Sequence, residues 1–265
     1  MPILYHYTSI DTLLLILKNM TLRFKSLGYV DDPLEPTTSD FGNLGTWKYV
    51  TCWSEVPESI PMWNMYADNM KGVCIGISFD EPTDIFYTEK YTFPDSVTID
   101  TVPFLNPKDS MFLTSHKYVP TLDKIIYTDD KSLITPKVVS FQNGEVSIDL
   151  SKNGIYKTTD WAFQKEQRFS LQILPVPKMY IPNFYEACKE YGFHKMMKFL
   201  YSVKFLEHID LLMNVEILNR MTITFGKNCT EDMKKEVKIA LGRYEQCGLH
   251  VPLLESTANI RSLFN

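Results

Sequence analysis

The sequence Gly-Val-Cys-Ile-Gly-Ile-Ser-Phe fills residues 72–79 and gives the clearest strand signal in the chain. An almost continuous apolar run lies within it, formed by Val73, Cys74, Ile75 and Ile77. A strand with one face in water alternates apolar and polar side chains, whereas a strand covered on both faces can be apolar throughout. We therefore predict a central strand that is buried on both faces.

Strand and helix signals precede this strand. Ser9 is a good N-cap, and Asp11 then lies in the first helical turn, where a negative charge is favourable. From the N-terminus we expect a strand at 3–7, a helix that ends near Met20, strands at 21–24 and 49–53, and a helix at 57–69. A loop rich in turn residues covers positions 31–45.

The second half of the chain is less regular. Residues 80–156 contain strand-like stretches at 124–127 and 144–150, without a clear period between 93 and 119. Beyond them we expect a long strand at 160–174, a helix at 184–201, a strand at 221–225 and a last helix capped by Thr230. No repeat or Gly/Ser linker divides the chain. The prediction is one α+β domain over residues 1–265, with a mixed, strongly bent sheet flanked by helices and an insertion-like stretch at about 80–156.

Composition excludes several classes of protein. The formal charge of -5 does not favour a strongly basic nucleic-acid-binding face. The five cysteines are widely spaced without a C-x-x-C pair, which argues against a zinc site and a disulfide framework and fits a reducing cytoplasm. The longest apolar runs, such as residues 13–17, are too short to span a bilayer, and the N-terminus does not read as a signal peptide. We expect a cytoplasmic protein without a membrane partner or a bound metal.

Five short patterns occur in a set order along the chain. They are YHYT at 5–8, DDPLE at 31–35, CWS at 52–54, MWNMYA at 62–67 with KGVCI at 71–75, and WAFQKEQR at 161–168. This order resembles the bacterial family called domain of unknown function 2971, from Leu4 to about Thr230. Two positions depart from the family pattern, because Asp31 stands where Asn is usual and Gln164 where Glu is frequent. The family resemblance by itself implies no activity.

A second resemblance implies a function. The segment 6–8, Tyr66 and the segment 164–166 resemble the His-Tyr-Glu pattern of ADP-ribosyltransferases. The resemblance implies an ADP-ribosyltransferase-like fold with NAD as substrate. It also implies roles: His6 and Thr8 hold a ribose, Tyr66 stacks on nicotinamide, Gln164 positions the acceptor and Glu166 stabilises the transition state. His6, Tyr66 and Glu166 should then converge on one cleft.

The chemistry explains the choice of Glu166. Breaking the bond between nicotinamide and ribose passes through an oxocarbenium-like state, which a nearby carboxylate stabilises. If 160–174 is one strand, Gln164, Glu166 and Arg168 share a face. That polar row could equally be a solvated sheet face with a Glu166–Arg168 ion pair, on which Glu166→Gln would cost little stability.

Each of the other candidate residues could have a functional role or a structural one. Arg168 is expected to order Glu166 or a phosphate, since a guanidinium suits both. Ser54 could bind ribose or cap the next helix, and Arg23 could meet a phosphate or be an exposed strand residue. His6 could instead be a core residue bonded to backbone. The turn with Asp31, Asp32 and Glu35 could bind a cation, but an acidic turn beside Pro33 is more often a solvated loop.

Absent motifs narrow the function further. The sequence has no H-E-x-x-H, no G-x-G-x-x-G after a strand, no P-loop and no G-x-S-x-G. We expect an NAD-consuming ADP-ribosyltransferase or NAD glycohydrolase that modifies a macromolecule or uses water, in the manner of a bacterial toxin or anti-phage defence effector. The alternatives are a non-catalytic nucleotide- or protein-binding module, and a metal-independent ribonuclease that uses His6 with a second His.

Overall fold

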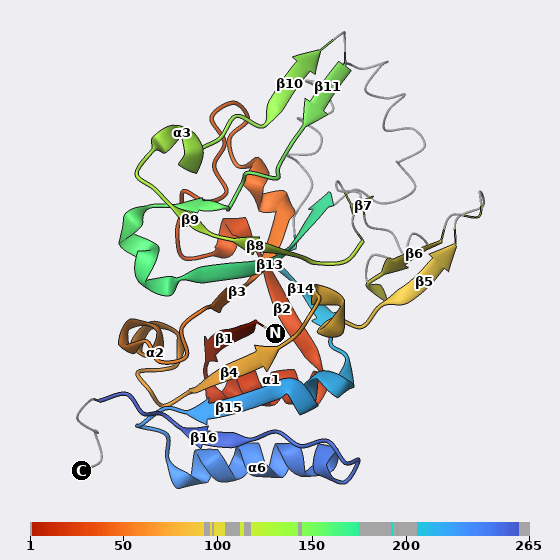
Figure 1. The fold of residues 1–265 in the computed structure, drawn as a ribbon. Coiled ribbons are helices and arrows are strands. Elements are labelled where there is room, and N and C mark those ends of the chain that lie inside the picture. The colour runs from red at the N-terminus through yellow and green to blue at the C-terminus, as the bar shows by residue number, and fades with distance from the viewer. Residues whose placement is uncertain are drawn as a thin grey trace.

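A large mixed sheet is the centre of the fold (Figure 1). The computed structural model describes residues 2–92, 96, 98–103, 112–113, 118–142, 145–174, 192, 195 and 206–259. Along the main path of the sheet the strands follow the order β14 (His208–Leu212), β2 (Thr21–Ser26), β3 (Lys48–Ser54), β1 (Ile3–Thr8), β4 (Val73–Ser78), β15 (Met221–Phe225) and β16 (Leu253–Glu255). The β15–β16 pair is parallel and the other pairs are antiparallel. The predicted α+β class with a mixed sheet is confirmed.

A branch widens this sheet, and three two-stranded ribbons form separate sheets. β13 (Glu166–Leu174) runs antiparallel to the whole of β3 and also pairs with β8 (Thr121–Lys124) and β7 (Phe112–Leu113). The ribbons are β5 (Glu89–Thr92) with β6 (Thr98–Thr101), β9 (Ile126–Tyr127) with β12 (Tyr156–Lys157), and β10 (Val139–Gln142) with β11 (Glu145–Ile148). The described helices are α1 (Ile10–Asn19), α2 (Ile60–Tyr66), α3 (Lys131–Ile134) and α6 (Glu231–Glu245).

The sheet forks along one edge of β3. Since β13 occupies the other edge completely, β1 and β2 must share this one. β2 pairs only with Tyr49 and Val50, and β1 pairs only with Ser54. Residues 51–53 therefore lack a strand partner on this edge. We call this divergence of β1 from β2 the fork.

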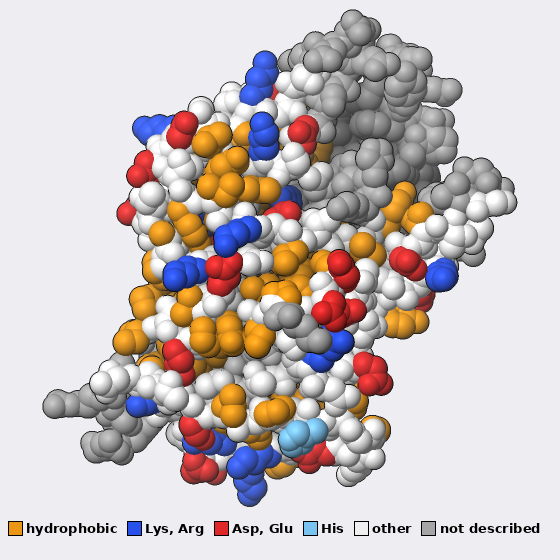
Figure 2. Space-filling model, in the orientation of Figure 1, with side chains coloured by type: hydrophobic (Ala, Val, Ile, Leu, Met, Phe, Trp, Pro, Cys, Tyr) orange, Lys and Arg blue, Asp and Glu red, His pale blue; other side chains and the backbone are white. Residues whose placement is uncertain are grey.

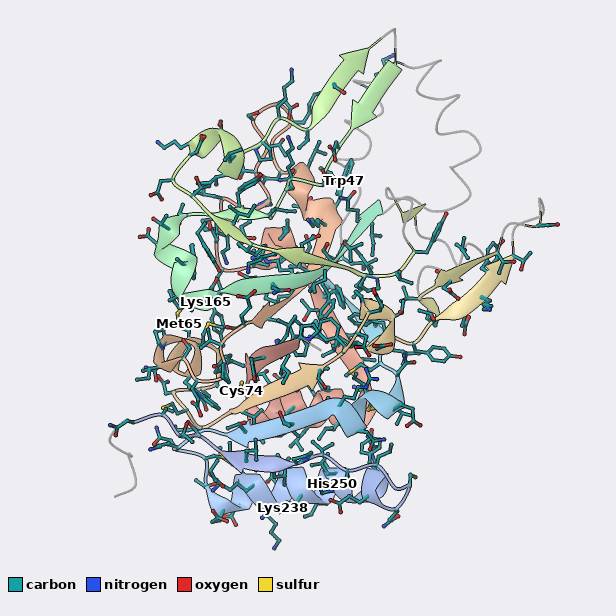
Figure 3. All side chains as sticks on the ribbon, viewed as in Figure 1. Trp47, Met65, Cys74, Lys165, Lys238 and His250 are labelled. Carbon is teal, nitrogen blue, oxygen red and sulfur yellow. The ribbon has the colours of Figure 1, made fainter. Side chains whose placement is uncertain are left out.

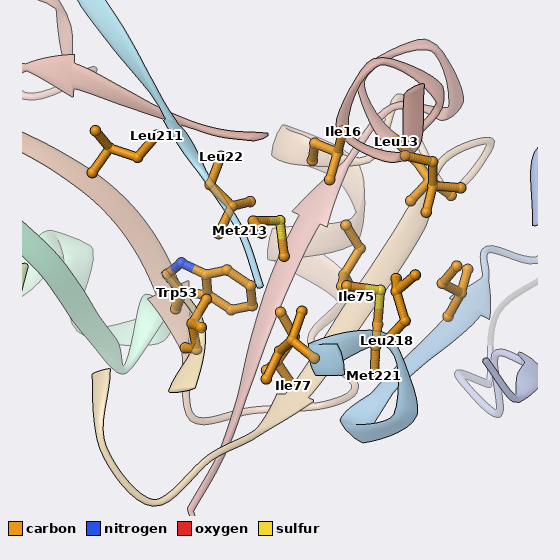
Figure 4. Close-up of a cluster of buried hydrophobic side chains, with 14 of the residues drawn as sticks. Leu13, Ile16, Leu22, Trp53, Ile75, Ile77, Leu211, Met213, Leu218 and Met221 are labelled. Atoms are coloured by element: carbon orange, nitrogen blue, oxygen red, sulfur yellow. The ribbon is translucent and has the colours of Figure 1, made fainter. Parts of the chain in front are cut away.

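The main core lies between the sheet and two helices that contact each other, α1 and α6. Figure 4 shows Ile75 and Ile77 of β4 among side chains from α1 and β15. On the opposite face of β4, Cys74 packs in a smaller cluster with Tyr7 and Trp63. The prediction that this strand is buried on both faces is confirmed.

Helix boundaries follow the capping signals. The Ser9 hydroxyl accepts a hydrogen bond from Thr12 N, and the Thr230 hydroxyl accepts one from Met233 N. Met20 ends α1 in the left-handed region, with φ 50°. The predicted strands near both chain ends and the strand at 49–53 are likewise confirmed within one or two residues.

Two predicted elements were too long. Only Glu166–Leu174 of the predicted strand 160–174 is extended, because Thr159–Gln164 forms a 3-10 helix, η5, which Lys165 ends with φ 42°. The apolar alternation of Trp161 and Phe163 had imitated a strand. The predicted helix 57–69 is confined to Ile60–Tyr66, since residues 68–70 all have positive φ.

Other predictions in the irregular middle of the chain were partly right. The strand at 124–127 is two strands, β8 and β9, which belong to different sheets. The strand at 144–150 is described as Glu145–Ile148, and position 144 lies outside the described residues, as does the predicted helix 184–201 except for residues 192 and 195. Among the described residues, no helix has the length and apolar character that crossing a membrane requires.

Two glycines make a matched test of this packing. A Cβ on Gly72, where α2 turns into β4, would overlap the Thr8 carbonyl oxygen, whereas a Cβ on Gly242 in α6 would meet nothing within 4 Å. Gly72→Ala should therefore lower the free energy of unfolding by roughly 1–3 kcal/mol or more. Gly242→Ala should raise it by about 0.5–1 kcal/mol, because alanine favours the helix. Urea denaturation measures both, and equal effects at the two positions would contradict the predicted packing.

Candidate functional site

The fork opens into a cavity of about 460 Å³, which we call the fork cavity. Its walls come from α1, β1, β2, β3 and α2, and from the segment that joins β12 to β13. A volume of this size is ordinary for a small-molecule site. The cavity exists here because the backbone of residues 51–53 faces side chains instead of a neighbouring strand.

Most of the candidate residues face this cavity although they are far apart in sequence. Those that line it are His6, Thr8, Arg23, Tyr66, Gln164, Glu166 and Arg168. The predicted convergence of His6, Tyr66 and Glu166 on one cleft is confirmed. Ser54 is the exception. It is fully buried outside the lining, and its hydroxyl donates to Gln164 O at 2.7 Å and accepts from Val56 N at 3.0 Å.

Four buried charges form one cluster at the base of the cavity. The Arg168 guanidinium donates to both carboxylate oxygens of Glu35 and to Glu166 Oε1. Lys157 Nζ contacts Glu166 Oε2 at 3.0 Å and Glu35 Oε1 at 3.3 Å. None of the four residues is more than 3% exposed. With two positive and two negative side chains, the cluster is neutral, as burial of charge requires.

The cluster fixes the charge state of Glu166. Burial raises the pKa of this carboxyl, but the charges of Arg168 and Lys157, with hydrogen bonds from Arg168 and Cys52, outweigh it and bring the pKa down to about 2. In the same way, burial lowers the pKa of Arg168 while Glu166 and Glu35 raise it well above its ordinary value. Glu166 is therefore a fixed carboxylate with both oxygens paired.

This cluster overturns two expectations. Glu166 does not lie on a solvated sheet face, so Glu166→Gln would leave buried cations poorly compensated and cost more stability than expected. Glu35 is not in a solvated turn and has no oxygen left for a cation, because its partners are Arg168 and Lys157. Among the described residues, no three His, Cys, Asp or Glu side chains are grouped as a metal site requires.

Lys157 was missed by the sequence analysis. No motif surrounds it, and it lies on a short strand that pairs outside the main sheet. Glu35 belonged to a quoted motif, but its acidic neighbours and Pro33 favoured a solvated loop. The two-residue spacing of Glu166 and Arg168 correctly placed them on one face, and Arg168 does order Glu166 as predicted.

His6 caps the open edge of β3. Its Nδ1 lies 2.9 Å from the Cys52 carbonyl oxygen, and its ring lies 5.1 Å from the Trp53 ring. Burial lowers the pKa of His6, so the ring is neutral near pH 7. Because a carbonyl only accepts, Nδ1 carries the proton and Nε2 remains as an acceptor without a partner among the described residues. His6 can thus be bonded to the backbone and still offer Nε2 to a ligand.

Tyr66 and Arg23 stand at other walls of the cavity. The Tyr66 hydroxyl accepts from Gln164 Nε2 at 2.7 Å, and burial, followed by the charge of the nearby Asp31 carboxylate and the hydrogen bond to it, raises the pKa of Tyr66. Arg23 makes a forked contact with Asp210, at 2.9 and 3.1 Å, and its side chain is 53% exposed. On the face drawn in Figure 2, positive and negative side chains are interspersed.

Arg168 and Arg23 offer a matched test of the buried cluster, since both make forked contacts with a carboxylate. Arg168→Lys keeps the charge but loses the fork, and should lower the free energy of unfolding by on the order of 3 kcal/mol. Arg23→Lys changes an exposed pair and should cost less than about 1 kcal/mol. Urea denaturation of both variants checks this, and similar losses would show that the cluster contributes no more than a surface pair.

The Glu166 pKa predicts a dependence of stability on pH. The folded pKa of about 2 lies below the ordinary 4.5, so its contribution is complete above about pH 5 and lost as pH falls toward 2. The complete loss from this group is about 3 kcal/mol near pH 2, and about 2 kcal/mol of it occurs between pH 7 and 3. Urea unfolding between pH 7 and 3 measures it. The Glu166→Gln variant should start less stable at pH 7 yet lose less on acidification, and an unchanged acid slope would refute the assignment.

Comparison with known proteins gives a family but no activity. No curated protein matches the chain. No solved structure matches it either. Residues 62–169 match the family described as protein of unknown function (DUF2971), which is the family that the sequence motifs resemble.

Proposed function

We propose that this chain binds NAD in the fork cavity and breaks the bond between nicotinamide and ribose, passing ADP-ribose to a macromolecule or to water. One observation carries the proposal: His6, Tyr66 and the pair Gln164 and Glu166 come from three separate segments and line a single cavity. On this proposal the forked sheet is an ADP-ribosyltransferase-like fold. Its natural role would be that of a bacterial toxin or anti-phage defence effector in the cytoplasm.

The lining of the cavity supports a nucleotide ligand. Tyr66 and His6 bring aromatic rings to the cavity, on which a nicotinamide or a base can stack. His6 Nε2 is an acceptor for a ribose hydroxyl, and Thr8 adds a hydroxyl. Arg23 and Lys25, two residues apart on β2, are exposed at the same cavity and suit the phosphates.

The proposed step transfers one group. The bond from the ribose C1′ atom to the ring nitrogen breaks, and its electron pair moves onto nicotinamide, which leaves neutral. The acceptor then bonds to C1′ and releases its proton to solvent. Glu166 stays ionised at every physiological pH and would stabilise the positive charge on the sugar. Gln164, two residues before it, would position the acceptor.

One observation favours a second candidate, a nucleotide-binding module without turnover. Both oxygens of Glu166 are already paired with cations, which weakens the negative field at the cavity. The ribonuclease alternative has less support, since His6 is the only histidine that lines the cavity in the part of the chain described.

Purified protein incubated with NAD separates these candidates. We expect wild-type protein to release nicotinamide, with or without added cell extract as a source of acceptor. His6→Ala should reduce the rate about tenfold or more, since it removes a hydrogen bond to the ribose. His250→Ala, at an exposed position outside the cavity, should leave the rate unchanged. Chromatography measures nicotinamide, and calorimetry measures NAD binding.

The outcomes are distinct. NAD that binds but stays intact, even with extract present, would support the non-catalytic module. NAD that neither binds nor disappears would end the NAD proposal. RNA cleavage that His6→Ala abolishes and NAD does not affect would support the ribonuclease.

A further inference from the structure

A chain of hydrogen bonds joins Lys157 to the cavity wall. Lys157 Nζ lies 2.8 Å from Gln164 Oε1, and Gln164 Nε2 lies 2.7 Å from the Tyr66 hydroxyl. Lys157 and Gln164 are buried, and Tyr66 is half-buried at the cavity. The consecutive elements β12 and η5 thus meet α2, which is distant in sequence, through two contacts.

The chemistry of the ammonium group fixes which atoms donate and which accept in these two hydrogen bonds. An ammonium nitrogen donates and never accepts, so its partner in the Gln164 side chain must be the oxygen. The amide nitrogen therefore faces Tyr66, whose oxygen accepts. One N–H of Gln164 is used in this contact, and the second remains available. Without Lys157, the amide could rotate by half a turn and present its oxygen, with the Tyr66 hydroxyl turning its proton from Asp31 to Gln164.

Lys157 is itself held in place. Its nitrogen also contacts Glu166 and Glu35, and it lies 4.8 Å from the centre of the Trp161 ring. The backbone of β12 pairs with β9 in parallel register. These contacts fix the ammonium from several sides, so the orientation of the Gln164 amide is fixed as well.

We propose that Lys157 is a positioning residue that locks Gln164 with its N–H groups toward Tyr66 and the fork cavity, so that this wall selects a ligand with a carbonyl oxygen. The choice of carbonyl rests on the proposed function and assigns the remaining Gln164 N–H to the leaving group in place of the acceptor: a nicotinamide stacked on Tyr66 would place its carboxamide oxygen beside Gln164. The sequence did not predict the contact between Lys157 and Gln164. It depends on η5, and the sequence pattern had predicted a strand in its place.

Lys157→Met tests the lock, with Lys165→Met as its matched control. Lys165 is exposed directly between Gln164 and Glu166 (Figure 3). With 13C at the phenol carbon of tyrosine, NMR reports a change in the hydrogen bonds of the Tyr66 hydroxyl, and Tyr66→Phe assigns its signal. We expect Lys157→Met to shift this signal, while Lys165→Met and the charge-conserving Lys157→Arg leave it in place. An unchanged signal in folded Lys157→Met would overturn the lock.

Loss of one charge from the buried cluster could unfold Lys157→Met. The double variant Lys157→Met with Glu35→Gln removes one charge of each sign and keeps Glu166 paired with Arg168. It should show the same shift of the Tyr66 signal relative to Glu35→Gln alone. If this balanced variant leaves the signal in place, the lock is also refuted.

A second arm tests the ligand. Calorimetry compares NAD with its thioamide analogue, whose sulfur is a poorer acceptor. Wild type and Lys165→Met should bind NAD about tenfold more tightly than the analogue, and Lys157→Met should lose most of this preference. Equal binding of the two ligands by wild type would overturn the carbonyl assignment. If neither ligand binds, the proposed function fails together with the carbonyl assignment, while the tyrosine signal still decides the lock.

Discussion

Burial of four charges is the constraint on which the rest of the site depends. Arg168 and Glu166 lie on β13, Glu35 lies in the loop after β2, and Lys157 lies on β12. Each would be costly to bury alone, because a charge away from water must be paired. The ion pairs therefore hold the loop and the β9–β12 ribbon against β13, in addition to apolar contact. A further bond, from Arg168 to the Gly154 carbonyl at 3.0 Å, ties the turn before β12 to the same guanidinium.

The fork gives this cluster access to a ligand. A continuous sheet would cover β3 on both edges, whereas here β1 and β2 separate and leave residues 51–53 open. The free Cys52 carbonyl is satisfied by His6, which turns an unpaired backbone group into part of the cavity wall. The cavity thus has apolar walls from two cores and a charged base, the arrangement that positions a polar ligand with few groups.

The pairing of Glu166 shapes what the site can do. Arg168 and Lys157 keep it ionised and immobile, which favours a preorganised site. They also reduce the field that it directs at a ligand. The same cluster therefore supports tight positioning more directly than it supports strong charge stabilisation, and the balance between these effects separates an enzyme from a binding module.

Local signals in the sequence determined the elements with clear patterns. The apolar run at 72–79, the Ser9 and Thr230 caps and the strands near both chain ends are set by interactions within a few residues, so the sequence alone placed them. The same local reasoning failed at 160–165, where alternating aromatics imitated a strand although Lys165 turns into the left-handed region. The convergence of His6, Tyr66 and Glu166 was reached from family motifs, since no periodicity links positions so far apart. Only the tertiary structure decided that the Glu166 face is buried, that Glu35 and Lys157 complete its ion cluster and that Ser54 lies outside the cavity. Those outcomes depend on which distant segments exclude water from one another, and no spacing along the chain encodes that.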